Sequence, residues 1–272
     1  QDVVNVTHSD LDGMACAAVV KKKYPKARIF YTNYGRDTPY AAFVKGSKMI
    51  VTDFTLPEME FTKAKNMGLD LHWIDHHSAN FVPAQNKGFN FPGLRSDDMC
   101  GAMLAFRYLF PGEEIPEVLK LIDDYDRWQW KYGERTRDFS NGMELFEQRV
   151  SMRKCHIWYD LLSENKEIAQ RTLETVISFG QKIGEFTRKR HALICSDLTY
   201  PCDWQGRKFL IANMKHTNSM FFDTYPNKKD ADVLSILQYA PDVKKFRCSV
   251  YSPDDVKAVL PVAQMFPGGG GH

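Results

Sequence analysis

Three short strand-like runs near the start of the chain each lead directly into acidic or histidine side chains. The runs are 3–7, 48–52 and 69–74, and they are followed by His8-Ser9-Asp10-Leu11-Asp12-Gly13, by Asp53 and by Asp75-His76-His77. Their length and β-branched content are typical of buried strands. Segments with helical spacing of apolar residues separate them, which is the pattern of a parallel sheet with helices on both faces.

Further strands and helices follow from the same patterns. A fourth strand is predicted at 28–33, and helices are predicted at 13–24, 57–67, 97–110, 115–130 and 164–191, with either Asp97 or Asp98 as the cap of the third. The stretch 133–151 is polar and less regular. Strand patterns return at 193–196, 208–213 and 246–251. The expected fold class is α/β: a doubly wound, mainly parallel sheet joined by a long helix to a smaller α/β C-terminal domain. The predicted boundaries are 1–150, 151–191 and 192–272.

Composition excludes several classes of protein. The 272 residues include 43% hydrophobic residues, 36 basic and 34 acidic side chains, for a net charge of +2. That balance argues against a broad cationic surface for long nucleic acid. The six cysteines form no Cys-x-x-Cys pair, which favours a reducing compartment. No apolar run approaches the ~20 residues of a membrane span, and no signal peptide is visible. We therefore expect a cytoplasmic protein, trimmed at its start because it lacks an initiator Met.

The acidic and histidine groups predict a metal site. Side chains at the carboxyl ends of parallel strands meet at one edge of a sheet. Carboxylates together with imidazoles suit manganese or a similar metal. Two divalent ions about 3.5–4 Å apart clamp the attacking and leaving oxygens in phosphoryl transfer, and they need a bridging carboxylate. Asp53 stands between the other two motifs and suits that role.

Each motif alone has a simpler explanation. A single Asp after a strand is usually a turn or a helix cap, and Asp12-Gly13 is a common turn signal. Four isolated histidines are expected to be structural: His72, His156, His191 and His216. The three motifs together, each behind a predicted strand, would rarely coincide by chance.

With these motifs the chain resembles the DHH phosphoesterase superfamily over nearly its whole length. The first motif corresponds to His8 through Gly13, the second to Asp53 and the third to Asp75-His76-His77. The stretch 122–128 resembles the fourth motif. The Gly-rich ending at His272 resembles the substrate motif of the DHH-associated C-terminal domain. Residues 1–150 would then be the catalytic metal-binding domain, 151–191 a helical linker and 192–272 the substrate-binding domain.

The resemblance implies a role for each site residue. His8 and Asp10 would bind one metal, Asp12 and His76 the other, and Asp53 would bridge both. Asp124 would complete the second site, with Asp126 as its close competitor. Asp75 would orient its neighbouring histidine, and His77 would face the phosphate. The cofactors would be two divalent ions, Mn²⁺ first, with Mg²⁺ and Co²⁺ as alternatives.

The end of the chain is expected to bind the substrate. A glycine run lets backbone N–H groups approach an anion, so the expected contacts are Gly269, Gly270, Gly271 and His272. Arg95 is a candidate phosphate partner, as are Arg127 and Arg247. Aromatic rings that could stack on a base are Trp128, Trp130 and Tyr251, and the two tryptophans fit a core role equally well. Family members usually continue past this glycine motif, so we expect a truncated end. Tyr251 stands where many carry arginine.

The resemblance implies a nanoRNase-like exonuclease, or oligoribonuclease, that hydrolyses short oligonucleotides or dinucleotides with a water activated by two metals. The short spacing from His8 to Asp10 matches a nanoRNase-like subgroup. Alternatives are a phosphatase for 3′-phosphoadenosine 5′-phosphate, a cyclic dinucleotide phosphodiesterase and, lower, a pyrophosphatase. An alternative from another class is a catalytically silent nucleotide sensor. No membrane or long duplex partner is expected. RNA or DNA preference, polarity and oligomeric state stay open, with a homodimer as one option.

Overall fold

The computed structural model describes residues 2–33, 38–40, 43–146, 149–150, 156–214, 218–241, 244–254 and 259–266. The chain divides into two compact units, 1–183 and 184–272. The boundary between them falls inside the predicted linker 151–191, and the three-part division itself stays a prediction. Among the described residues, no helix has the length and apolar character needed to cross a membrane.

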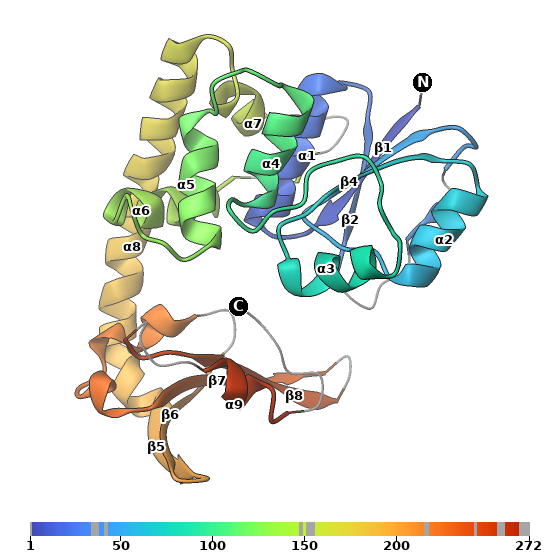
Figure 1. The fold of residues 1–272 in the computed structure, drawn as a ribbon. Coiled ribbons are helices and arrows are strands. Elements are labelled where there is room, and N and C mark those ends of the chain that lie inside the picture. Colours follow the sequence, from blue (N-terminus) through green and yellow to red (C-terminus); the bar gives the residue numbers. More distant parts are fainter. Residues whose placement is uncertain are drawn as a thin grey trace. The chain divides into compact units, whose positions relative to one another are not determined.

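Unit 1 is built on a four-stranded parallel sheet (Figure 1). Its strands lie in the order β2 (Arg28–Thr32), β1 (Val3–His8), β3 (Lys48–Thr52) and β4 (Asp70–Ile74). All three pairings are parallel and in register, so the strands end at one common edge. The predicted α/β fold class with a parallel sheet is confirmed.

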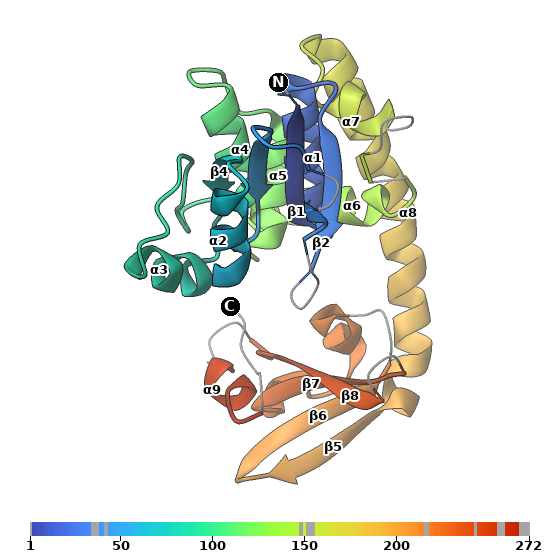
Figure 2. The ribbon, with the colours of Figure 1, turned by 90° about the vertical axis from the view of Figure 1, so that its right-hand side faces the viewer.

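Helices cover both faces of this sheet (Figure 2). One face packs Ile50 and Ile74 against α1 (Leu11–Lys23), α4 (Gly101–Leu109) and α5 (Glu117–Asp126). The other face packs Met49 and Val51 against α2 (Glu58–Asn66) and α3 (Ser78–Asn86). Strands buried on both faces explain why the sequence shows continuous apolar runs there instead of an alternating pattern.

Helix boundaries differ from the sequence prediction in several places. The helix predicted from Asp97 or Asp98 begins at Gly101, and the helix predicted to Trp130 ends at Asp126. The stretch 133–151 contains α6 (Glu134–Met143), which is followed by α7 (His156–Leu161). The strand predicted at 193–196 is wrong, because α8 (Lys166–Leu198) continues through it. Cys195 is buried in a core with Phe221, and that tertiary contact outweighs the local β-propensity.

Two glycines allow α6 and α8 to cross at backbone contact. A Cβ atom on Gly142 would lie 2.0 Å from the carbonyl oxygen of Val176, and one on Gly180 would lie 1.6 Å from that of Asp138. Both distances are far below van der Waals contact. Only glycine fits at either position while the helices keep this spacing.

Unit 2 contains a second four-stranded sheet in the order β5-β6-β7-β8. The strands are β5 (Thr199–Trp204), β6 (Arg207–Asn213), β7 (Val233–Ala240) and β8 (Lys245–Tyr251). The middle pair is parallel and the outer pairs are antiparallel. The short elements η2 (Ser219–Thr224), η3 (Lys228–Asp230) and α9 (Leu260–Ala263) accompany the sheet. The predicted smaller α/β C-terminal region is therefore present, although β5 and β7 were not predicted.

Candidate metal centre

The carboxyl edge of the unit 1 sheet gathers polar side chains from three neighbouring strands. His8 ends β1, Asp53 follows β3 and Asp75 follows β4. The backbone N–H of Asp53 donates to the carbonyl of Ile74 at 2.9 Å, which ties the ends of β3 and β4 together. Parallel pairing alone therefore brings together residues that are far apart in sequence.

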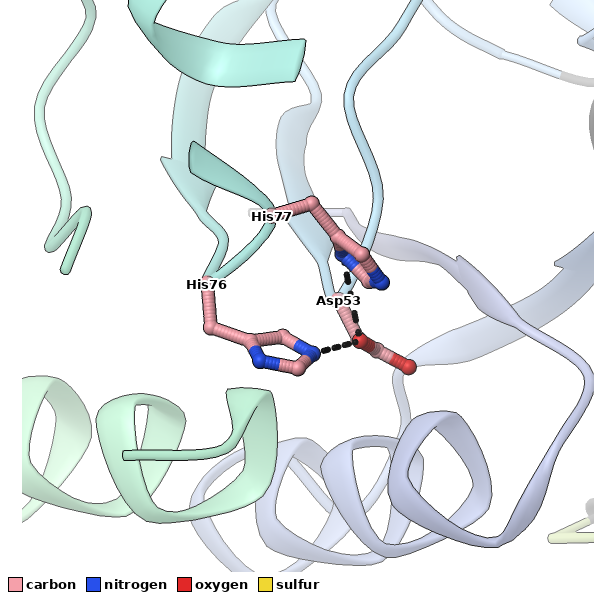
Figure 3. Close-up of side chains that lie close together, drawn as sticks. All are labelled: Asp53, His76 and His77. Atoms are coloured by element: carbon pink, nitrogen blue, oxygen red, sulfur yellow. Dashed lines mark hydrogen bonds and ion pairs between the residues drawn. The ribbon is translucent and has the colours of Figure 1, made fainter. Parts of the chain in front are cut away.

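Asp53 lies at the centre of the cluster. Its side chain is 1% exposed, and its Oδ1 lies 3.1 Å from His76 Nε2 and 3.8 Å from His77 Nδ1 (Figure 3). Its Oδ2 lies 4.0 Å from His8 Nδ1 and accepts no hydrogen bond from the residues that the structure describes. A buried carboxylate oxygen without a donor is costly. The residues therefore fit a cation at this oxygen.

The backbone of Asp53 has the left-handed conformation, with φ at 53°. Aspartate tolerates this region better than most residues. The side chain lies near His8, the last residue of β1, and near His76 and His77, which follow β4.

Asp53, His8 and Asp10 form one group of donors that could hold an ion. Asp10 is the N-cap of α1, where its Oδ1 accepts the N–H of Gly13 at 2.9 Å, and its Oδ2 lies 2.5 Å from His8 Nδ1. The Asp10 carboxylate raises the pKa of His8. Burial alone would raise the pKa of Asp10, but the contact with His8 holds it below its ordinary value.

A second group combines Asp12, His76 and Asp126. His76 Nε2 lies 3.8 Å from Asp12 Oδ2 and 3.5 Å from Asp126 Oδ2. Burial and the charge of Asp10 raise the pKa of Asp12 to about 6, and burial and the charge of Asp12 raise that of Asp126 to about 7. Burial also raises the pKa of Asp53, well above its ordinary value, and lowers that of His76. Neutral imidazole is the form that binds metals.

The first turn of α4 positions Asp12. The N–H groups of Gly101 and Ala102 donate to its two carboxylate oxygens at 2.7 and 2.9 Å, so the helix N-terminus supports the negative charge. A Cβ atom on Gly101 would lie 2.8 Å from Asp53 Cβ and 2.9 Å from Asp12 Oδ2. The sequence analysis missed this role of Gly101. The available signal was the run of small residues Cys100-Gly101-Ala102 at the start of a predicted helix.

The structure places Asp126, and not Asp124, beside the other donors. Both oxygens of Asp124 are already occupied: Oδ1 accepts the N–H of Lys131 at 2.6 Å, and Oδ2 accepts the N–H of Tyr132 at 3.1 Å and the hydroxyl of Thr136. The expectation that Asp124 completes the second metal site is therefore corrected. Its carboxylate instead holds the loop after α5, and Asp126 takes the candidate ligand position.

Asp75 acts on His77. Its Oδ1 accepts from the backbone N–H of His77 at 3.1 Å and from His77 Nδ1 at 2.8 Å, and its Oδ2 accepts the hydroxyl of Thr55. Burial lowers the pKa of His77, but the hydrogen bond and charge of Asp75, together with the charges of Asp126 and Asp12, raise the net pKa above its ordinary value. Asp75 thus contacts both the backbone and the ring of His77, and its role as an orienting partner stays a prediction.

The predicted substrate contacts receive less support. Arg95 donates from Nη1 to the carbonyl of Trp73 at 2.7 Å and from Nη2 to that of Phe91 at 2.9 Å, and its guanidinium lies 5.0 Å from the ring centre of Trp73. These contacts join β4 to the segment after α3, and the role of Arg95 as a phosphate partner stays a prediction. The remaining predicted contacts, Gly269, Gly270, Gly271 and His272, lie outside the described residues.

Comparison with known proteins identifies the fold. No protein-family model and no curated protein matches the chain. Among solved structures, it is similar to a pGpG-specific phosphodiesterase from Vibrio cholerae, with 16% identity, a TM-score of 0.53 and coverage of 100% of this chain and 90% of that one. It is also similar to the DHH domain of a protein assigned to a family of ribosomal proteins, with 13% identity, a TM-score of 0.57 and coverage of 94% and 74%. The chain therefore has the DHH-domain fold, as the sequence motifs predicted.

Replacing Gly101 with alanine should weaken metal binding without unfolding the protein. The added methyl group must displace Asp12 or Asp53, since it would lie within 3 Å of both side chains. We expect the dissociation constant for Mn²⁺, measured by electron paramagnetic resonance titration, to rise by about 10- to 100-fold, the range found when the support of a metal ligand is lost. Ala102→Gly is the matched control, because it changes the same helix turn and adds no atom. Equal affinities in the two variants would contradict this role.

Substitution of Asp126 and Asp124 should have different effects. Asp126→Asn should reduce Mn²⁺ affinity and change the melting temperature little, because its carboxylate faces His76 at the cluster. Asp124→Asn should lower the stability by about 1–3 kcal/mol, because it replaces one of the two buried oxygens that accept these hydrogen bonds with an NH2 donor. Thermal melting and metal titration of both variants separate the two roles. A larger loss of metal affinity in a folded Asp124→Asn protein would reverse the assignment.

The metal-free protein should lose stability as the pH rises from 5 to 8. The folded-state pKa values of Asp12 and Asp126, about 6 and about 7, are raised above the unfolded value of about 3.9. Their contribution is therefore present at low pH and is lost as the pH rises through those values. A fixed Mn²⁺ concentration, set at a hundred times the dissociation constant measured at pH 8, should raise the free energy of unfolding by about 2.7 kcal/mol at pH 8. The same concentration should raise it less at pH 5, where protons compete for the ligands. The measurement is the melting temperature with and without Mn²⁺, with Asp53→Asn as the variant that should respond less to both. A larger gain from Mn²⁺ at pH 5 would be the opposite result.

Proposed function

We propose that this protein is a metal-dependent phosphodiesterase that hydrolyses dinucleotides or short oligonucleotides. The observation that carries the proposal is the arrangement of three donor groups that share Asp53 or His76. The groups are His8, Asp10 and Asp53; Asp53, His76 and His77; and Asp12, His76 and Asp126. Overlapping groups of this kind suit two ions held close together and bridged by a carboxylate. The mixture of carboxylates and imidazoles favours Mn²⁺, with Mg²⁺ and Co²⁺ as alternatives.

Each candidate ion has its own donors. His8 and Asp10 would hold one ion, Asp12, His76 and Asp126 the other, and Asp53 would bridge them. Two bound divalent ions would stabilise the charge on the attacking and leaving oxygens of an in-line displacement at phosphorus. The backbone N–H groups of Gly13, Gly101 and Ala102 orient Asp10 and Asp12 for this task.

His77 is the candidate catalytic imidazole. Asp75 accepts a hydrogen bond from its Nδ1 and thereby fixes both the tautomer and the ring orientation. That leaves Nε2 as the ring atom that can interact with a phosphate oxygen. Burial lowers the pKa of His77 and Asp75 raises it, with a net increase, so His77 is suited to donate a proton to the phosphate or the leaving oxygen.

Several observations support a short substrate. The near-zero net charge does not suit a long nucleic acid track. The similar Vibrio cholerae protein is specific for the dinucleotide pGpG. We therefore place a nanoRNase-like exonuclease or linear dinucleotide phosphodiesterase first, with residues 192–272 as the substrate-binding part and Gly269, Gly270, Gly271 and His272 as its phosphate contacts. A cyclic dinucleotide phosphodiesterase and a 3′-phosphoadenosine 5′-phosphate phosphatase are the enzyme alternatives.

A substrate panel with Mn²⁺ tests the proposal. The panel contains labelled di- to heptanucleotides, cyclic dinucleotides, 3′-phosphoadenosine 5′-phosphate and pyrophosphate. We expect cleavage of the linear short substrates. Asp53→Asn should reduce this activity by more than the roughly 10- to 100-fold that is typical when an outer partner of a metal ligand is lost. Asp97→Asn, at an exposed carboxylate, is the control. Cleavage of pyrophosphate alone would refute the diesterase. A silent sensor would cleave nothing and would lack near-stoichiometric metal after purification.

A further inference from the structure

The loop after α5 contains two tryptophans in a backbone conformation that bulky residues rarely adopt. We name residues 127–132 the tryptophan loop. Trp128 has φ at 55° and Trp130 has φ at 57°, so both lie in the left-handed region. A large side chain in that region is an outlier that persists only where the surroundings enforce it, and such strain clusters at ligand sites.

Hydrogen bonds to Asp124 and Tyr125 hold the tryptophan loop in this conformation. The carboxylate of Asp124 accepts hydrogen bonds from the N–H groups of Lys131 and Tyr132 and from the hydroxyl of Thr136. The backbone carbonyl of Asp124 accepts the N–H of Gln129 at 2.9 Å, and that of Tyr125 accepts the N–H of Trp128 at 3.1 Å. A buried acid is thus committed to holding this loop in its strained form.

The rings of the loop form a small aromatic group with Tyr125. The ring centres of Trp128 and Trp130 are 4.8 Å apart at 75°, and Tyr125 lies 5.7 and 5.9 Å from them. Yet Trp128 is still 37% exposed, whereas Trp73 and Trp158, which serve the core, are 0% and 2% exposed. Neither of those core tryptophans has a positive φ. Core packing therefore does not account for the strain at Trp128.

The loop also begins at the candidate metal centre. Asp126, whose Oδ2 lies 3.5 Å from His76, is only two residues before Trp128. Two residues of chain span at most ~7 Å, so the backbone of Trp128 lies close to that of Asp126. An aromatic platform at this place would suit a base next to a phosphate bound at the candidate metal centre.

We propose that Trp128, held by the tryptophan loop, is the stacking platform for a nucleobase adjacent to the reacting phosphate. The inference rests on the proposed function and names the substrate class more narrowly: a phosphodiester with a base on the nucleoside at this position. Stacking uses the π-face that every base has, so it selects nucleotides over other phosphodiesters without selecting one base. The preformed ring group limits the ordering cost on binding.

The test compares a 5′-phosphorylated dinucleotide with two analogues in which one base or the other is replaced by hydrogen. In Trp128→Leu, KM for the full dinucleotide should rise about 5- to 150-fold with little change in kcat, which corresponds to the roughly 1–3 kcal/mol of one stacked base. One of the two analogues should show no such difference between variant and wild type. Trp128→Phe should keep most of the affinity, because it keeps an aromatic face. Tyr159→Leu, which removes another exposed ring of unit 1, should behave as wild type.

Two results would overturn the platform. One is an equal loss for the full dinucleotide and both analogues in Trp128→Leu, which would show a structural role. The other is no loss at all. If the wild type cleaves no phosphodiester, the proposed function fails separately, and the platform is then read from quenching of tryptophan fluorescence by adenosine and guanosine monophosphates. Quenching that is lost in Trp128→Leu supports it, and quenching that is equal in both proteins refutes it.

Discussion

Carboxylates buried side by side repel one another, and this repulsion is the constraint on which the sheet edge of unit 1 depends. Asp12 and Asp53 are 2% and 1% exposed, and burial together with the charge of Asp12 raises the pKa of both Asp53 and Asp126. Two features reduce the cost: hydrogen bonds from the first turn of α4 to Asp12, and imidazoles between the acids. The remainder of the cost, centred on Asp53 Oδ2, is the part that cations would remove.

Order around the cluster comes from outer partners that do not touch the candidate ions. Asp75 fixes His77, Gly13 lets the chain pass close to His8, and Gly101 leaves room between Asp12 and Asp53. Asp124 accepts hydrogen bonds from the backbone of the loop beyond Asp126 and holds that loop in place. Each of these residues is adjacent in sequence or in space to a candidate ligand, and each acts by holding a backbone or a ring in place. A site of this kind is preorganised by its surroundings as much as by its donors.

The sequence could predict those parts of this arrangement that are local. Apolar runs followed by His8, Asp53 and His76 marked three strand ends, and parallel pairing brought them together. The sequence could not predict that Arg95 donates to the carbonyls of Trp73 and Phe91, because the proximity of these segments depends on the fold. It could not distinguish Asp126 from Asp124, because each lies one helical turn after a buried residue, Ile122 and Leu121 respectively. Gly101 needed a contact across 89 residues with Asp12, which no local pattern contains.

The close crossing of α6 and α8 has a consequence for anyone who redesigns this protein. Gly142 and Gly180 fix how α6 lies, and α6 carries Thr136, which donates to the carboxylate of Asp124. The crossing thereby sets the position of a hydroxyl that anchors the tryptophan loop several residues away. A library that diversifies substrate preference at residues 127–132 should leave both glycines unchanged. A single added methyl group at either of them would displace α6 and with it Thr136. Loop variants would then no longer be compared on the same backbone.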